Sequence, residues 1–197
     1  MTGTANRSMV LWADSLARRI TAMHSLWQIG VDDLTLDQVN HFERSGVLPI
    51  AFSLLHFVRS EDNATSRYLL KEPSLWDTGE WATKIGPTVE DVGRGTPMPV
   101  AEQLRFRNVD AWKAYQAAVF DRTETAFAAL PPDRFAETPL GDALPETMAG
   151  AFISYAVPPG RAPTLLDVIE CFVYQHGIRH LGELEHARAL VGLSGAS

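Results

Sequence analysis

The strongest constraint on the fold is a set of four long segments in which apolar residues recur every three or four positions. These segments cover residues 8–30, 48–70, 109–130 and 165–191. Such spacing places the apolar side chains on one face of an α-helix. In the first segment, Leu16, Ile20 and Met23 follow this pattern. Because the alternation typical of strands is almost absent, the sequence predicts an all-α protein.

Glycine, proline and capping residues mark the ends of these helices. Gly30 is expected to stop the first helix, Pro73 to close the second, and Pro131 and Pro132 to stop the third. Thr164 fits the N-cap of the fourth helix. Four long helices of this kind predict a four-helix bundle, and the long loop between the second and third helices permits a crossover connection.

The connections differ in length and character. The linker after the first helix is polar, with a short helical piece expected after Thr35. The connection 71–107 holds four prolines, four glycines and the tryptophans Trp76 and Trp81, and a short helix is expected at 81–85. Connections of this length are usually functional or disordered. The apolar stretch 147–157 fits neither a helix nor a strand clearly.

Composition narrows the class of protein. The chain has 197 residues, 46% apolar and 21% charged, which suits one folded domain covering residues 1–197. The net charge of −7 and the absence of a Lys and Arg cluster argue against a nucleic-acid-binding protein. The apolar runs are too short to cross a membrane, and the first residues lack the pattern of a secretory signal. A cytoplasmic location without membrane association is therefore expected.

Cys171 is the single cysteine of the chain. One cysteine forms neither an internal disulfide nor a thiolate-rich zinc site, so any metal has to be bound by histidine and carboxylate groups. The segment DVIECFVYQ surrounds Cys171 with apolar helical sequence. This setting favours a buried structural cysteine over a catalytic nucleophile.

Two histidines of the fourth helix, His176 and His180, stand four residues apart. This spacing puts both imidazoles on one helix face, as two ligands of one metal ion require. They continue the apolar stripe of the helix. Gly177 and Gly182 each destabilise a helix by about 1 kcal/mol relative to alanine, and such glycines usually permit close approach of a neighbour.

His56 is the leading candidate for a third ligand, because it lies on the apolar face of the second helix. The other three histidines are weaker candidates. His24 is in mid-helix beside polar sequence, His41 lies in a polar linker, and His186 is displaced by about 80° from the face of the paired histidines. The alternative interpretation is that the histidines belong to the core and form hydrogen bonds there.

Four stretches of the chain are similar to a known family: IAFSLLHFVRSED in the second helix, WDTGEWATKIG in the following loop, AYQAAVFDRTETAFAAL in the third helix, and YQHGIRHLGELEHARALVGL in the fourth. Together they resemble the DinB/YfiT-like superfamily of metal-binding four-helix bundles, over most of the chain. The resemblance implies that His56, His176 and His180 bind a divalent ion in an open site. Zinc and nickel are the first candidates for that ion, with iron and manganese as further ones.

The resemblance also implies an activity. Relatives include thiol-dependent S-transferases and isomerases that use mycothiol or bacillithiol, with the metal holding the thiol as a thiolate. A metal-dependent enzyme acting on a small molecule, with a low-molecular-weight thiol as cosubstrate, is therefore expected, and hydrolysis is a further reaction type. A homodimer is the expected assembly. The alternative is a non-catalytic metal-binding module that serves dimerisation or ligand binding.

Several charged residues are candidates for supporting roles. Glu183, Asp62 and Glu61 could each orient a metal-binding imidazole through its second nitrogen, and the sequence does not select among them. Arginines of the second helix and the 71–107 connection could bind an acidic group of a substrate: Arg59, Arg94, Arg105 and Arg107.

Overall fold

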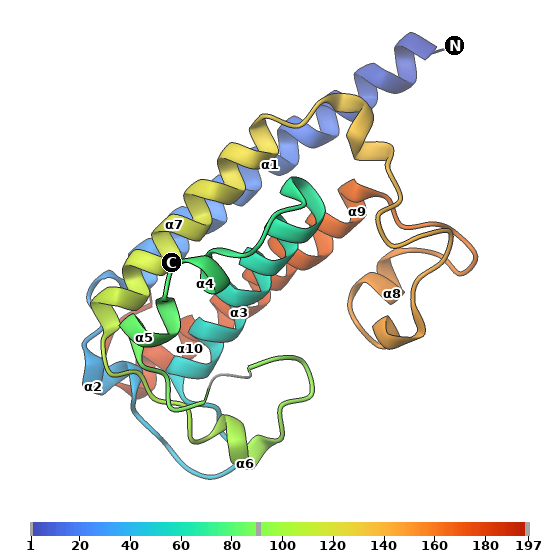
Figure 1. Cartoon of the computed structure of the whole chain (residues 1–197). Coiled ribbons are helices and arrows are strands. Elements are labelled where there is room, and N and C mark those ends of the chain that lie inside the picture. Colours follow the sequence, from blue (N-terminus) through green and yellow to red (C-terminus); the bar gives the residue numbers. More distant parts are fainter. Residues whose placement is uncertain (1, 90–91, 196–197) are drawn as a thin grey trace.

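The computed structural model describes residues 2–89 and 92–195, with side chains of the first helix described from residue 8 onward. The long helices run alongside one another (Figure 1). Their bounds are Thr2–Asp32 for α1, Ile50–Ala64 for α3, Val109–Ala128 for α7 and His176–Leu190 for α10. Helices α3, α7 and α10 lie within segments that the sequence predicts to be helical, whereas α1 extends beyond the predicted segment 8–30 at both ends. Gly30 does not stop α1, which continues to Asp32.

The core lies between these helices. Helix α3 packs against α7 and α10, and α1 packs against the same two helices. Large side chains from three of the helices are fully buried at the centre, namely Trp27, Phe57, Trp112, Tyr115 and Phe120. Since α3 and α10 adjoin along their length, side chains that lie far apart in the sequence meet at their seam.

Two of the long helices contain a π-helical turn that the sequence pattern does not predict. Helix α3 continues into η1, Thr65–Leu70, while α10 is preceded by α9, Leu165–Ile169, and the π-helix η4, Glu170–Gln175. The rings of Tyr68 and Phe172 join the two π-helical segments, with centroids 6.2 Å apart. The π-helix is rare and occurs frequently at functional sites. Here η4 ends directly before the first histidine of α10.

The connection 71–107 is ordered by short helices and by one buried carboxylate. Its helices are α4, Leu75–Thr78, then α5, Trp81–Ile85, and α6, Met98–Ala101. The bounds of α5 match the helix expected at 81–85. Asp62 of α3 is buried and accepts hydrogen bonds from the backbone amides of Leu75 and Trp76 and from the Tyr115 hydroxyl, at 2.8–3.0 Å. Asp62 thereby fixes the start of α4 on α3.

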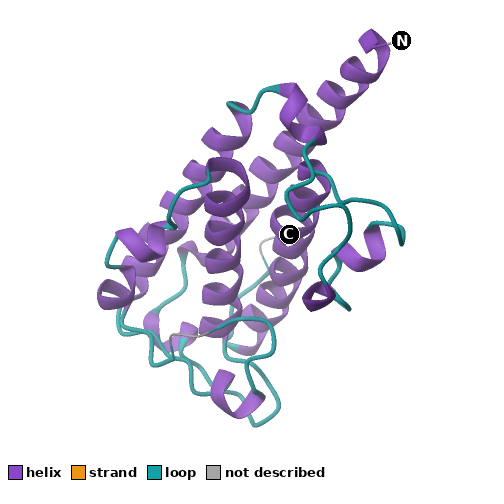
Figure 2. Ribbon diagram, turned by 45° about the vertical axis from the view of Figure 1, so that its right-hand side comes forward, coloured by secondary structure: helices purple, strands orange, loops and turns teal. Residues whose placement is uncertain are grey.

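The remaining connections are also helical where they are regular. Helix α2, Leu36–Val39, follows Thr35 as expected, and the side chain of Thr35 caps it. The connection after α7 contains η2, Pro132–Ala136, η3, Glu146–Met148, and α8, Ile153–Ala156. The stretch 147–157 is thus helical in part. The described residues form no strand (Figure 2). Among them, none of the helices combines the length and apolar character needed to span a bilayer.

Candidate metal centre

Three imidazoles meet at the seam between α3 and α10. His56 comes from α3, and His176 and His180 come from the first turns of α10. The Nε2 atom of His176 lies 3.3 Å from Nε2 of His56 and 3.0 Å from Nε2 of His180. The structure therefore brings together the three histidines that the sequence selects as metal ligands, and they are the one such group among the described residues.

The second nitrogen of two of these rings has a fixed partner. Nδ1 of His56 contacts the backbone carbonyl of Val92, and Nδ1 of His180 lies 2.7 Å from a carboxylate oxygen of Glu183. A carbonyl or a carboxylate only accepts hydrogen bonds, so both Nδ1 atoms carry a proton. In the neutral form of each ring the lone pair is then on Nε2, the atom that lies beside Nε2 of His176.

The nitrogen separations fit ligands of one divalent ion. Imidazole nitrogens bound to zinc lie about 2.0–2.1 Å from the metal, which places neighbouring nitrogens of a tetrahedral site about 3.3 Å apart. The observed separations of 3.0 and 3.3 Å are close to this value. Three protein ligands leave at least one position for water or substrate, and all three side chains are partly exposed.

Burial lowers the pKa of two of these histidines, His56 and His176. Burial, together with the neighbouring rings of His180 and His56, lowers the pKa of His176 to about 2. Burial also lowers the pKa of His56, although the hydrogen bond to Val92 opposes this shift. Metal binding requires the neutral imidazole, so the environment favours the form that can act as a ligand.

Glu183 is the carboxylate that orients a ligand. Its Oε2 atom accepts hydrogen bonds from Nδ1 of His180, at 2.7 Å, and from the hydroxyl of Ser53, at 3.0 Å. Burial raises the pKa of Glu183, but the contacts with His180 outweigh it and the net pKa is lowered. The other two candidates lie elsewhere: Asp62 caps α4, and Glu61 faces α1.

Close packing of α1 fixes the position of His176. A Cβ atom added to Gly177 would collide with the thioether of Met23 and lie 2.8 Å from Cζ of Phe57. The indole of Trp27 donates a hydrogen bond of 3.1 Å to the Gly177 carbonyl. The expected close approach is therefore present at Gly177. It is absent at Gly182, where an added Cβ would meet no atom of the described residues within 4 Å.

No protein-family model matches the sequence, and no curated protein matches it either. A crystal structure of a conserved protein from Enterococcus faecalis is similar to this one, with a TM-score of 0.64. The match covers 89% of this chain and 94% of that chain at 16% sequence identity. At this identity the similarity shows a shared fold alone.

The three remaining histidines differ among themselves. His41 and His186 are exposed, and His41 pairs with Glu43. His24 is buried, and its Nδ1 lies 2.8 Å from Glu124 and its Nε2 lies 3.0 Å from Glu61. Burial lowers the pKa of His24, but the two carboxylates outweigh this effect and raise it. His24 thus belongs to a second buried cluster, which the sequence analysis did not identify.

Other candidate residues have structural contacts. Arg94 donates to the Ala149 carbonyl at 2.7 Å, Arg105 donates to the carbonyls of its own loop, and Arg59 stacks on Trp76. Arg107 lies against Gly86. Cys171 is buried, and burial together with the nearby carboxylates raises the pKa of its thiol to about 12. This agrees with the structural role expected for the cysteine.

Proposed function

We propose that the protein is a divalent-metal-dependent enzyme that acts on a small molecule through His56, His176 and His180. One observation carries the proposal: the Nε2 atoms of His56 and His180 lie 3.3 and 3.0 Å from Nε2 of His176, so the three imidazoles converge on one point. Zinc or nickel suits three neutral imidazoles, because borderline ions prefer this ligand over carboxylate or carbonyl oxygen. Iron and manganese are the further candidates.

The reaction that we propose is a thiol-dependent S-transfer or isomerisation of the mycothiol or bacillithiol type. A divalent ion held by three imidazoles lowers the pKa of a coordinated thiol or water and so supplies a nucleophile at neutral pH. The Val92 carbonyl and Glu183 hold the protons on Nδ1 of His56 and His180. They keep both Nε2 atoms available as ligands and fix the orientation of the rings.

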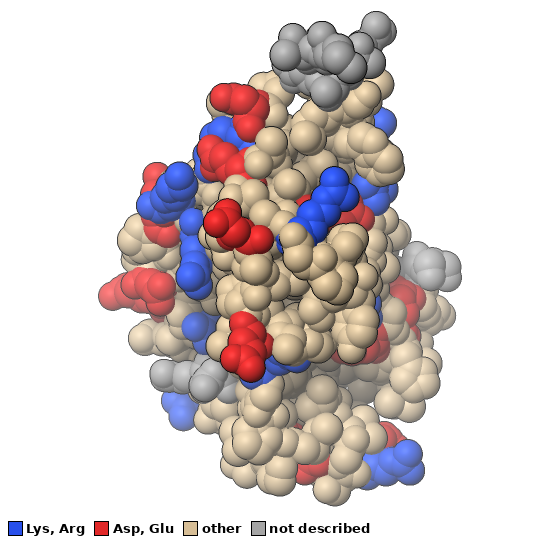
Figure 3. Space-filling view, turned by 90° about the vertical axis from the view of Figure 1, so that its right-hand side faces the viewer, with Lys and Arg blue, Asp and Glu red and all other residues tan. Residues whose placement is uncertain are grey.

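The fold and surface are compatible with this proposal. We propose that the long helices form a DinB-like four-helix bundle, supported by the side-by-side packing of α1, α3, α7 and α10. On the face shown in Figure 3, Lys and Arg side chains lie among Asp and Glu rather than apart from them. With the net charge of −7, this supports a small-molecule substrate over a nucleic acid. The homodimer and the cytoplasmic location remain predictions.

Metal analysis of the purified protein tests the first step of this proposal. The protein is loaded with Zn²⁺ or Ni²⁺, passed through a desalting column, and its metal content measured by mass spectrometry. We expect about one ion per chain in the wild type and loss of it in His56→Ala. An exposed histidine of α10 serves as the control, since His186→Ala should keep the ion. Stoichiometric metal in His56→Ala would overturn the three-histidine site.

A second measurement separates the enzyme from the binding module. The metal-loaded protein is assayed with mycothiol, bacillithiol and glutathione against a panel of small electrophiles. Turnover that disappears in His56→Ala supports the enzyme. Stoichiometric metal without turnover for any pair would favour the non-catalytic metal-binding module.

A further inference from the structure

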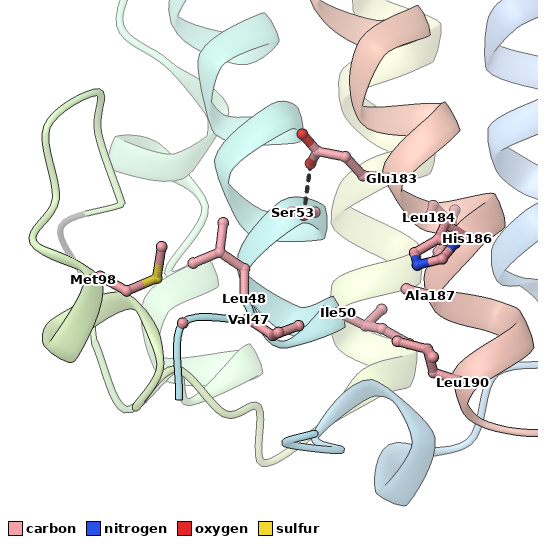
Figure 4. A pocket seen from close by; sticks show the side chains of 11 residues that line it. Val47, Leu48, Ile50, Ser53, Met98, Glu183, Leu184, His186, Ala187 and Leu190 are labelled. Atoms are coloured by element: carbon pink, nitrogen blue, oxygen red, sulfur yellow. Dashed lines mark hydrogen bonds between the residues drawn. The ribbon is translucent and has the colours of Figure 1, made fainter. Parts of the chain in front are cut away.

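A groove of about 320 Å³ lies beside the metal centre, at the end of the α3–α10 seam. Figure 4 shows its walls, which come from the turn before α3, from the first turn of α3, from α6 and from the second half of α10. Most of the lining side chains are apolar, among them Leu48, Met98, Leu184 and Leu190. A volume of this size is at the lower end of the range for small-molecule sites.

The lining of the groove includes one carboxylate, that of Glu183. Glu183 lies at one end, next to Ser53; His186 is the other titratable side chain of the lining, and no Lys or Arg occurs among the described residues that line it. The carboxylate repels an anionic ligand, and apolar walls give such a ligand little compensation. The groove therefore suits a molecule that is neutral or cationic and carries an alkyl or aryl group.

The groove and the metal centre share a residue. Ser53 lies three residues before His56 on α3, and Glu183 lies three residues after His180 on α10, so each is about one helical turn away. Glu183 links the two places, because its Oε2 atom accepts from both Ser53 and His180. A ligand in the groove would thus have one end about 5 Å along the seam from the imidazoles.

We propose that this groove binds the apolar part of the substrate, a neutral or cationic small molecule whose reactive end reaches the three histidines. The proposal rests on the proposed function, because it assigns the groove to the substrate of that site. It excludes from the groove molecules that carry a carboxylate or phosphate at the end nearest Glu183.

Two fluorescent probes with the same aromatic rings test the groove directly. N-phenyl-1-naphthylamine is neutral, and 8-anilino-1-naphthalenesulfonate adds a negative charge. We expect the neutral probe to bind about tenfold more tightly than the anionic one, because of the carboxylate. Ala187→Phe places a ring in the groove and should weaken the neutral probe about tenfold. The matched control is Ala189→Phe, an exposed position of α10 outside the groove, which should leave binding unchanged.

The outcomes separate this proposal from the metal site. His56→Ala should lose its metal and still bind the neutral probe, whereas Ala187→Phe should keep its metal and lose the probe. Equal binding of the two probes, or undiminished binding in Ala187→Phe, would overturn the groove proposal and leave the metal site intact. A change in the oligomeric state of Ala187→Phe, measured by light scattering, would also overturn it, since the groove would then be an interface between copies.

Discussion

The two histidine clusters differ in burial and in the groups that face their ring nitrogens: His56, His176 and His180 are partly exposed, whereas His24 is buried. At the metal centre, ring nitrogens of His56 and His180 face a third ring, and burial lowers the pKa of His176. Around His24, both ring nitrogens face carboxylates, which raise its pKa. The groups opposite the nitrogens therefore distinguish the clusters: three converging imidazole nitrogens offer ligands to a metal ion, whereas converging carboxylates favour a protonated imidazole.

The largest expected effect separates the clusters by metal binding. His176→Ala removes the central ligand, and two remaining imidazoles are too few for a firm site, so stoichiometric Zn²⁺ should be lost. His24→Gln removes a buried histidine that faces carboxylates and should retain one ion per chain. Isothermal titration with Zn²⁺ measures both. If His24→Gln lost the ion while remaining folded by circular dichroism, the separation of the clusters would be wrong.

The next effect is on the stability of the folded protein, through the ion pair of His24 with Glu61. Glu61 is fully buried, and its carboxylate oxygens have no hydrogen-bond partner among the described residues. The ion pair with His24 is therefore the main interaction that offsets the cost of burying this charge. Glu61→Ala leaves a buried cationic imidazole without that partner and should lower the free energy of unfolding by about 3–5 kcal/mol, measured by urea denaturation.

A double variant provides the control for this prediction. Replacing both partners by apolar residues of similar size, in His24→Leu with Glu61→Leu, removes the buried charges together and should restore much of the lost stability. If the double variant were as unstable as Glu61→Ala, lost packing rather than lost pairing would explain the effect.

The two clusters also differ in how far the sequence predicts them. The spacing of His176 and His180, together with the apolar surroundings of His56, was sufficient to select the three histidines that the structure brings together, because a helix turns a four-residue spacing into one face. The same logic failed for His24. Its partners Glu61 and Glu124 lie on other helices, so their proximity depends on how α1, α3 and α7 pack.

The long helices were predictable, but their internal irregularities were not. Periodicity located α1, α3, α7 and α10, since apolar stripes are a local property. The π-helical turn of η4 changes the helix register just before His176, and it has no signal in a 3.6-residue pattern. The Val92 carbonyl that orients His56 could not be predicted either, because a backbone group in a connecting loop leaves no mark in side-chain chemistry.

A smaller effect, on metal affinity, is expected when Glu183, the carboxylate next to His180, is replaced. Glu183 accepts from Nδ1 of His180, so Glu183→Gln weakens a charge-assisted hydrogen bond without removing a ligand. Metal affinity should fall about 10- to 100-fold, measured by competition with a chelator. Glu185→Gln, two residues further along α10, is the control and should change affinity little. Equal losses in the two variants would point to general helix charge instead of the contact with His180.

The smallest effect is a dependence of stability on pH. Because the carboxylates raise the pKa of His24 above its ordinary value of 6.5, the folded state holds this proton more tightly than the unfolded state. The resulting stabilisation is fully present below pH 6.5 and declines as the pH rises through the raised pKa. The midpoint temperature of thermal unfolding of the metal-free protein should therefore fall as the pH is raised from 6.5.

Variants of the same cluster make this dependence specific. In His24→Gln the titrating group is gone, so the midpoint temperature should decline less over the same pH interval. Adding a chelator throughout removes any contribution of metal binding at the three histidines. Parallel curves for wild type and His24→Gln would mean that His24 is not the proton-binding group. The contrast between the clusters would then rest on metal binding alone, because the carboxylates of Glu61 and Glu124 would be stabilised by something other than a protonated imidazole.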